Sequence, residues 1–194
     1  MKHVRYLPLL ALGSLLGARP TSAQTTSTQT TPPRPQSTAQ TSLLTQQSPA
    51  QRPSPAQTAT GNIGKATVTV AYSSPSVKGR SIWGALVPYG QVWRAGANEA
   101  TTFTTNQPLI VEGKTLPAGT YSLFTIPTEK QWTVIFNKTA KQWGAFKYDQ
   151  QQDALRVTAT PRKAANLQEQ LVYEVTPQGL VLRWENLELP VSMK

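Results

Sequence analysis

From Gly61 to its C-terminus the chain is a series of short runs rich in β-branched and aromatic residues, each ended by glycine, proline or polar turn residues. Such runs at regular spacing are typical of antiparallel strands, and only Arg162 to Gln170 has a composition that tolerates a short helix. The expected strands cover residues 67–72, 101–105, 109–116 (a hairpin), 120–126, 132–137, 154–160 and 171–184 (a closing hairpin). We therefore expect an all-β fold, a single antiparallel β-sandwich or barrel-like domain, over residues 61–194.

The 60 residues before Gly61 differ sharply in composition. Lys2, His3 and Arg5 precede a short apolar run, and Thr21-Ser22-Ala23 supplies small residues at a cleavage point. This pattern predicts a signal peptide over residues 1–23 and an exported protein, periplasmic or extracellular. Residues 24–60 are mostly Thr, Gln, Ser, Pro and Ala, which predicts a disordered linker. No run approaches the roughly 20 apolar residues of a membrane-spanning helix, so we expect no membrane span.

The net charge of +10 does not by itself indicate a nucleic-acid-binding protein. Residues 1–60 hold five basic residues and no acidic one, so the expected domain carries only +5 and has no cluster of Lys or Arg. A nucleic-acid-binding surface needs such a cluster, and we expect no nucleic-acid partner. The charge supports at most a mild attraction to anionic envelope polymers or lipid head groups.

Several kinds of chemistry are excluded by residues that the chain lacks. It has no cysteine, and its single histidine is His3, inside the expected signal peptide. A mature chain without imidazole or thiol cannot run Ser-His-Asp or Cys-His catalysis and lacks the usual zinc and copper ligands. Its sequence also has no calcium-loop, Walker or Gly-rich dinucleotide motif. We expect neither a metal nor a cofactor.

The stretch from Gly79 to Thr105, GRSIWGALVPYGQVWRAGANEATTFTT, concentrates aromatic and charged residues between glycines and prolines. Loops of this kind on a rigid β scaffold commonly carry function. Aromatic rings can stack on sugars or other flat ligands, and the polar side chains can form directed hydrogen bonds. The ligand-binding candidates are Arg80, Trp83, Tyr89, Trp93, Arg94, Asn98 and Glu99. The alternative is that the two tryptophans fill the core and that Arg94 and Glu99 form an ion pair that holds the loop.

The same stretch resembles a known family. The motifs GR-x-IWG-x-LVPYG-x-VWR-x-GANEATT, LPAGTYSLFTIP, WTVIFNK and WGAFKYD are similar to those of the bacterial family catalogued as domain of unknown function 2911 (DUF2911), over about residues 73–191. The resemblance implies an export signal ahead of one β-rich domain, and it implies no activity. One departure is Ala95, where the resemblance leads us to expect a hydroxyl-bearing residue.

Three functions remain open. The first, which we take as our prediction, is a non-enzymatic envelope module that binds a glycan, a cell-wall polymer or an envelope protein through residues 79–105. The second is a carboxylate-dependent, glycosidase-like hydrolase in which Glu99 works with Glu185 or Asp149, because two carboxylates suffice for glycoside hydrolysis. The third is a purely structural envelope protein. Two further polar-aromatic groups are Lys138, Trp143, Lys147 and Tyr148, and Trp184-Glu185-Asn186; mixed groups of this kind more often pack at a rim than bind.

Overall fold

The computed structural model describes residues 52–194, so the expected signal peptide and residues 24–51 of the expected linker lie outside the described part. Within it the fold is all-β, as predicted, with no α-helix and only a 3-10 turn at Gln150–Gln152. No helix in residues 52–194 is long and apolar enough to cross a membrane. The strands are β1 (Ala56–Ile63), β2 (Ala66–Ser73), β3 (Thr101–Thr105), β4 (Leu109–Val111), β5 (Lys114–Leu116), β6 (Gly119–Ile126), β7 (Trp132–Asn137), β8 (Asp153–Ala159), β9 (Arg162–Thr176) and β10 (Gly179–Ser192).

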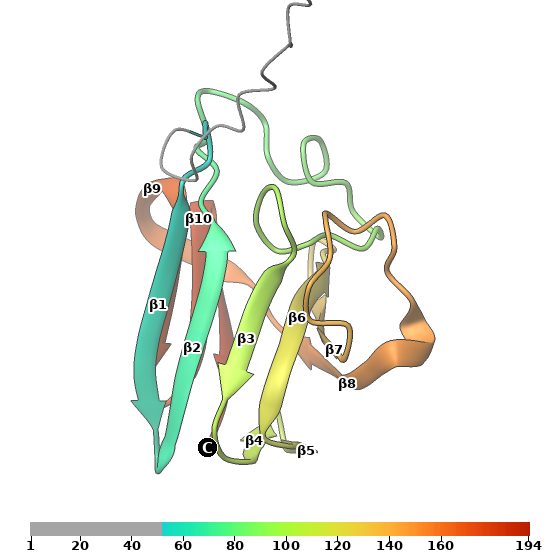
Figure 1. Ribbon diagram of the computed structural model, residues 1–194. Helices are drawn as coiled ribbons and strands as arrows, with labels where there is room; N and C mark the ends of the chain where they lie inside the picture. The colour runs from blue at the N-terminus through green and yellow to red at the C-terminus, as the bar shows by residue number, and fades with distance from the viewer. Residues whose placement is uncertain (1–51) are drawn as a thin grey trace, which may run out of the picture. The chain divides into compact units, whose positions relative to one another are not determined.

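The strands form one large sheet and two hairpins (Figure 1). The large sheet has the order β1-β2-β3-β6-β7-β8, and each neighbouring pair is antiparallel. The long β9–β10 hairpin packs on one face of this sheet, and the short β4–β5 hairpin lies at the end of the sheet near the C-terminus. The sheet ends at β1 and β8, so the fold is sandwich-like and not a closed barrel.

The core lies between the large sheet and the β9–β10 hairpin. Alternate residues of each strand point to the same face, which puts Val68 and Val70 of β2 on the inner face with Phe103 of β3. Leu182 of β10 and Leu171 of β9 face them from the hairpin and are equally buried. At about 25 cal/mol per Å² of buried apolar surface, this layer is the main source of stability for a domain without disulfides.

Four of the five tryptophans form one cluster at the end of this core. Trp93 stacks on Trp184 with ring centroids 5.9 Å apart, and Trp83 meets Trp132 edge-on at 4.8 Å. Trp83 also contacts Trp93 and Trp184 edge-on. The fifth tryptophan, Trp143, is 58% exposed and takes no part. For Trp83 and Trp93 the structure therefore favours the core role that the sequence left as an alternative.

The outer face of the large sheet is covered over only half its width. Phe124 of β6 and Ile135 of β7 are buried there beneath residues of the β7–β8 connection, which include Ala145 and Tyr148. Over β1, β2 and β3 no such cover lies among residues 52–194, and Thr58, Thr67 and Thr104 stay partly or fully exposed. A hollow forms where the covered half meets the open half.

Two segments differ from the sequence prediction. β1 begins at Ala56, five residues inside the expected linker, and its Ala56–Thr60 half pairs with Thr69–Ser73 of β2. The segment Arg162–Gln170, the one stretch whose composition tolerates a short helix, is instead the first half of strand β9. Pairing with β10 from Glu185 to Glu188 decides its conformation, because tertiary contacts override local propensity.

Candidate functional site

The candidate residues lie in the long β2–β3 connection, residues 74–100, which runs over one end of the sandwich (Figure 1). Backbone pairing holds this connection in place. Trp93 N donates to Thr125 O at 2.8 Å, and Thr125 N donates back to Trp93 O at 2.9 Å. Further along, Glu99 forms an isolated bridge with Trp143. The β2–β3 connection is therefore paired through its backbone with β6 and with the β7–β8 connection.

The backbone next to Arg94 is fixed by a buried carbonyl. Ala95 has φ +53 and is fully buried, and its carbonyl oxygen accepts hydrogen bonds from Thr101 Oγ1 at 2.9 Å and from the Tyr173 hydroxyl at 2.7 Å. A left-handed conformation costs an alanine about 1–2 kcal/mol, so the surrounding contacts must impose it. Strained backbone of this kind is concentrated at active sites and ligand-binding sites. Ala95 directly follows Arg94 in the chain.

Four of the seven candidates line one hollow of about 270 Å³, which we call the arginine cleft. Residues of three segments distant in sequence meet there, and no Asp or Glu is among them. Its lining includes Ser54, Arg80, Trp93, Arg94, Asn98 and Trp184.

Arg94 is a partly buried cation with no counter-ion. No carboxylate of residues 52–194 lies within 4.0 Å of its guanidinium, and residues 1–51 contain no Asp or Glu at all. Within residues 52–194 its Nε is buried without an acceptor, and burial lowers the pKa of Arg94 below its usual value. Charges taken out of water without a partner are costly, and such groups are concentrated at functional sites. The Arg94–Glu99 ion pair considered from the sequence does not form.

Other donors around the cleft are also incompletely used. Arg80 donates from Nε to Val77 O at 3.0 Å and from a terminal nitrogen to Ser76 O, but among residues 52–194 it too has no carboxylate partner. Trp184 is 1% exposed, and its Nε1 finds no acceptor in the described part. Asn98 has φ +57, and its Nδ2 donates one hydrogen bond, to Ser54 O at 3.2 Å. The lining of the cleft therefore has two positively charged side chains and N–H groups without acceptors in the described part.

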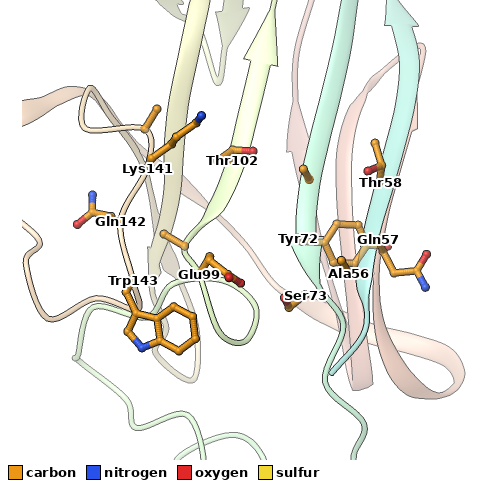
Figure 2. Close-up of a pocket in the computed structure, with 13 residues that line it drawn as sticks. Ala56, Gln57, Thr58, Tyr72, Ser73, Glu99, Thr102, Lys141, Gln142 and Trp143 are labelled. Atoms are coloured by element: carbon orange, nitrogen blue, oxygen red, sulfur yellow. The ribbon is translucent and has the colours of Figure 1, made fainter. Parts of the chain in front are cut away.

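Glu99 faces a different hollow of about 400 Å³, which we call the Trp143 groove (Figure 2). Trp143, Lys141 and Glu99 stand on one side of it, and Gln57 and Tyr72 stand on the other. Its floor is the open half of the outer sheet face, where alanine, serine and threonine leave room. Its volume is within the range of about 300–1,000 Å³ that small-molecule sites occupy.

Glu99 is the only carboxylate that lines this groove. Arg52 Nη1 lies 2.6 Å from Glu99 Oε1, and this hydrogen bond lowers the pKa of Glu99. Neither proposed partner joins it. Asp149 accepts from Gln151 N as the cap of the 3-10 turn, and Glu185 accepts from Asn186 N. The pair of carboxylates that a glycosidase needs is not assembled around the groove, and among residues 52–194 no three acidic side chains gather as a metal site.

Two of the seven candidates, Trp83 and Tyr89, line neither hollow. Several residues that do line a hollow or contact one were not among the candidates. Trp83 belongs to the tryptophan cluster, and Tyr89 stands exposed beside Thr128–Lys130. Arg52 and Ser54 were not candidates, because they fall within the segment expected to be a linker. Trp184 and Trp143 were noted only as members of mixed groups at strand ends, and nothing in one sequence separates a rim tryptophan from a binding one.

Comparison with known proteins identifies the family of the domain. The model of the family described as "Protein of unknown function (DUF2911)" matches residues 54–193. The chain belongs to this family. The match confirms the resemblance inferred from the loop motifs, and the DUF2911 domain starts close to β1. No curated protein and no solved structure matches the chain.

Proposed function

We propose that this DUF2911 protein is a non-enzymatic module that binds the acidic group, carboxylate or phosphate, of an envelope polymer in the arginine cleft. The observation that carries the proposal is Arg94, a partly buried guanidinium without a carboxylate partner in the whole chain. A guanidinium presents paired N–H donors that match the oxygen pairs of carboxylate and phosphate, which favours such a ligand over a neutral one.

The surroundings of Arg94 support the same chemistry. Arg80 adds a second positive charge, and Asn98 and Trp184 bring further hydrogen-bonding groups to the lining. The hydrogen bonds to Ala95 O hold the loop before any ligand arrives, so little ordering entropy is lost on binding. We extend the proposal to the location that the N-terminal signal predicts: the protein acts after export, in the periplasm or outside the cell, where acidic polymers are its partners.

The test is calorimetric titration of the purified protein with glucuronate, with glycerol phosphate and with glucose as the uncharged control. We expect binding of at least one of the two anions and none of glucose. In Arg94→Met the affinity should fall about 10- to 100-fold, since a hydrogen bond to a charged group contributes about 1.5–3 kcal/mol.

The matched control is Lys65→Met, which removes one positive charge at the exposed β1–β2 turn, far along the sheet from the cleft. It should bind as the wild type does, because screening suppresses the effect of a distant surface charge. The proposal fails if neither anion binds, or if both variants weaken binding equally, since the second result would reflect net charge and not the cleft.

A further inference from the structure

The Trp143 groove has the chemistry of a site for a sugar ring. Trp143 offers a flat apolar surface to solvent, with 58% of its area exposed. Around it Gln57, Glu99 and Lys141 supply donors and acceptors at the rim (Figure 2). A pyranose has an apolar C–H face and an edge of hydroxyl groups, so it needs both kinds of surface, and exposed tryptophan rings provide the first.

A buried acceptor next to this groove also lacks a donor. Gln142 Nε2 donates to Thr139 O at 2.9 Å and to Ser122 Oγ at 3.2 Å, which fixes the orientation of the amide. Its Oε1 then has no partner among residues 52–194. Buried polar atoms are nearly always paired, and a sugar hydroxyl in the groove would supply the donor after a small shift of the Gln142 side chain.

The groove and the arginine cleft are immediate neighbours. Three segments contribute to both, at positions one or two residues apart. These pairs, cleft residue first, are Ser54 and Ala56, Pro75 and Ser73, and Asn98 and Glu99. Since adjacent Cα atoms are about 3.8 Å apart, each segment passes from one hollow to the other within about 8 Å. A ligand of two or three linked rings is long enough to reach both.

We propose that the ligand is an acidic oligosaccharide. The carboxylate of one sugar pairs with Arg94 in the arginine cleft while a neighbouring pyranose ring stacks on Trp143 in the groove. This inference rests on the proposed function, because it takes the anion in the cleft as given and adds the ring in the groove. The charges agree with it: the cleft lining has no acid, and the one acid of the groove is already paired with Arg52.

The experiment compares three ligands by calorimetry on the purified protein: galacturonic acid, its α-1,4-linked trisaccharide, and the methyl-esterified trisaccharide, which keeps the rings but loses the charge. In the wild type we expect the charged trisaccharide to bind at least tenfold more tightly than the monomer. We expect the esterified trisaccharide to bind at least tenfold more weakly than the charged one.

Two variants of the same loop locate the ring. Trp143→Ala should lower the affinity for the charged trisaccharide to that of the monomer and leave monomer binding unchanged. Phe146→Ala is the matched control, because Phe146 is 85% exposed in the same connection but does not line the groove, and it should bind as the wild type does. Circular dichroism checks that both variants are folded.

The outcomes separate this inference from the proposed function. If the monomer and trisaccharide bind equally, or if Trp143→Ala leaves trisaccharide binding unchanged, the inference is overturned while the anion site stands. If the esterified trisaccharide binds as tightly as the charged one, the acid is not recognised and the inference is also overturned. If no acidic ligand of either experiment binds, both proposals fail.

Discussion

Replacing Arg94 by methionine should stabilise the protein in the absence of ligand. Methionine keeps an unbranched stem of similar length and removes the buried Nε–H that has no acceptor. A buried donor without a partner costs about 1–3 kcal/mol, and the terminal nitrogens of Arg94 have no hydrogen bond in the described structure to lose. Because the side chain is only partly buried, we expect the lower end of this range, a gain of about 1 kcal/mol.

The matched control is the same substitution at Arg156. Its Nη1 donates to Asp153 Oδ2 at 2.8 Å and to the Tyr148 hydroxyl at 2.7 Å, and the Asp153 side chain is only 6% exposed. Removing this arginine withdraws the counter-charge from a buried carboxylate. Arg156→Met should therefore lose about 1.5–3 kcal/mol, the contribution of a hydrogen bond to a charged group.

The assay is urea unfolding followed by tryptophan fluorescence, at low ionic strength and without added carboxylates or phosphate. A gain of about 1 kcal/mol corresponds to a rise in Tm of about 2–4 °C for a domain of this size, so thermal melts give a second reading. A loss of 1 kcal/mol or more in Arg94→Met would refute the reasoning. It would mean that the guanidinium stabilises the fold, and that its missing counter-ion does not indicate a ligand site.

Two further predictions concern β1 and the alkaline stability of the domain. A chain that starts at Gly61 lacks Ala56–Thr60 of β1, so its Tm should fall by several degrees relative to one that starts at Arg52; equal melts would show that this half of β1 adds nothing. Burial, and then the Asp153 carboxylate, raise the pKa of Tyr148 to about 12. The Tyr148 hydroxyl thus keeps its proton in the folded state at a pH where the unfolded state loses it, near 10. The stability that this proton contributes is complete below pH 10 and is lost as the pH rises through about 12. In Tyr148→Phe the free energy of unfolding should fall less between pH 10 and 12 than in the wild type, by about 1 kcal/mol after allowance for solvent screening. Urea unfolding at each pH measures this difference.

The strands that the sequence predicted well are those whose inner face is buried against the β9–β10 hairpin. β3 and β7 were predicted with their observed bounds, and β2 and β6 to within one residue at each end. In β2 and β3 buried and more exposed residues alternate, which is the period of a strand with one buried face. β6 and β7 are buried on both faces and were recognised instead as short runs of strand-forming residues between turns. An alternating pattern in the sequence identifies a strand when one face of that strand is buried and the other is not.

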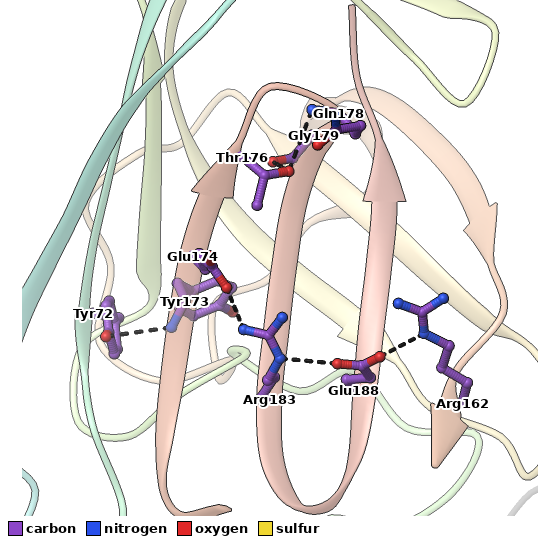
Figure 3. Close-up of polar contacts among 9 residues, drawn as sticks. All are labelled: Tyr72, Arg162, Tyr173, Glu174, Thr176, Gln178, Gly179, Arg183 and Glu188. Atoms are coloured by element: carbon purple, nitrogen blue, oxygen red, sulfur yellow. Dashed lines mark hydrogen bonds and ion pairs between the residues drawn. The ribbon is translucent and has the colours of Figure 1, made fainter. Parts of the chain in front are cut away.

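The sequence did not predict the first half of β1 or the first half of β9, because neither shows an alternating apolar pattern. Nearly all residues of Ala56–Thr60 and of Lys163–Gln170 are exposed or only partly buried, so neither segment carries an apolar period. What holds them is backbone pairing with the strand that follows each in the chain, β2 for β1 and β10 for β9. At the start of β9, Arg162 pairs with Glu188 of β10, and Glu188 in turn accepts from Arg183 (Figure 3). A single sequence does not say which strand will meet which.

The sequence predicted which stretch of the chain carries the candidate site, but not how its side chains are arranged. The Gly79–Thr105 stretch does contain Arg80, Arg94 and Asn98, which meet in the arginine cleft. The sequence could not divide the tryptophans between core and surface, because the division depends on which faces the connections cover. Nor could it separate Asn98 from Glu99, whose side chains enter different hollows although they are adjacent in the chain.

The turn between β9 and β10 provides a test of the packing at the other end of the molecule, where β10 bends back on itself. Gly179 lies in this turn (Figure 3) and has φ +140, a conformation open almost only to glycine. A Cβ added there would lie 2.1 Å from Val191 O, and Met193 N already donates to Gln178 O beside it at 3.0 Å. Both obstacles are backbone atoms, so no side chain can rotate away to make room.

Gly179→Ala should therefore cost strain and overpacking together, about 1–3 kcal/mol from each. Gly113→Ala is the control: it has φ +80 in the β4–β5 turn, but an added Cβ meets nothing within 4 Å, so only the backbone strain of about 1–2 kcal/mol remains. Urea unfolding of the two variants measures the difference. If they lose equal stability, the C-terminal segment is not held against the turn, and the close approach of Val191 to Gly179 contributes nothing to the fold.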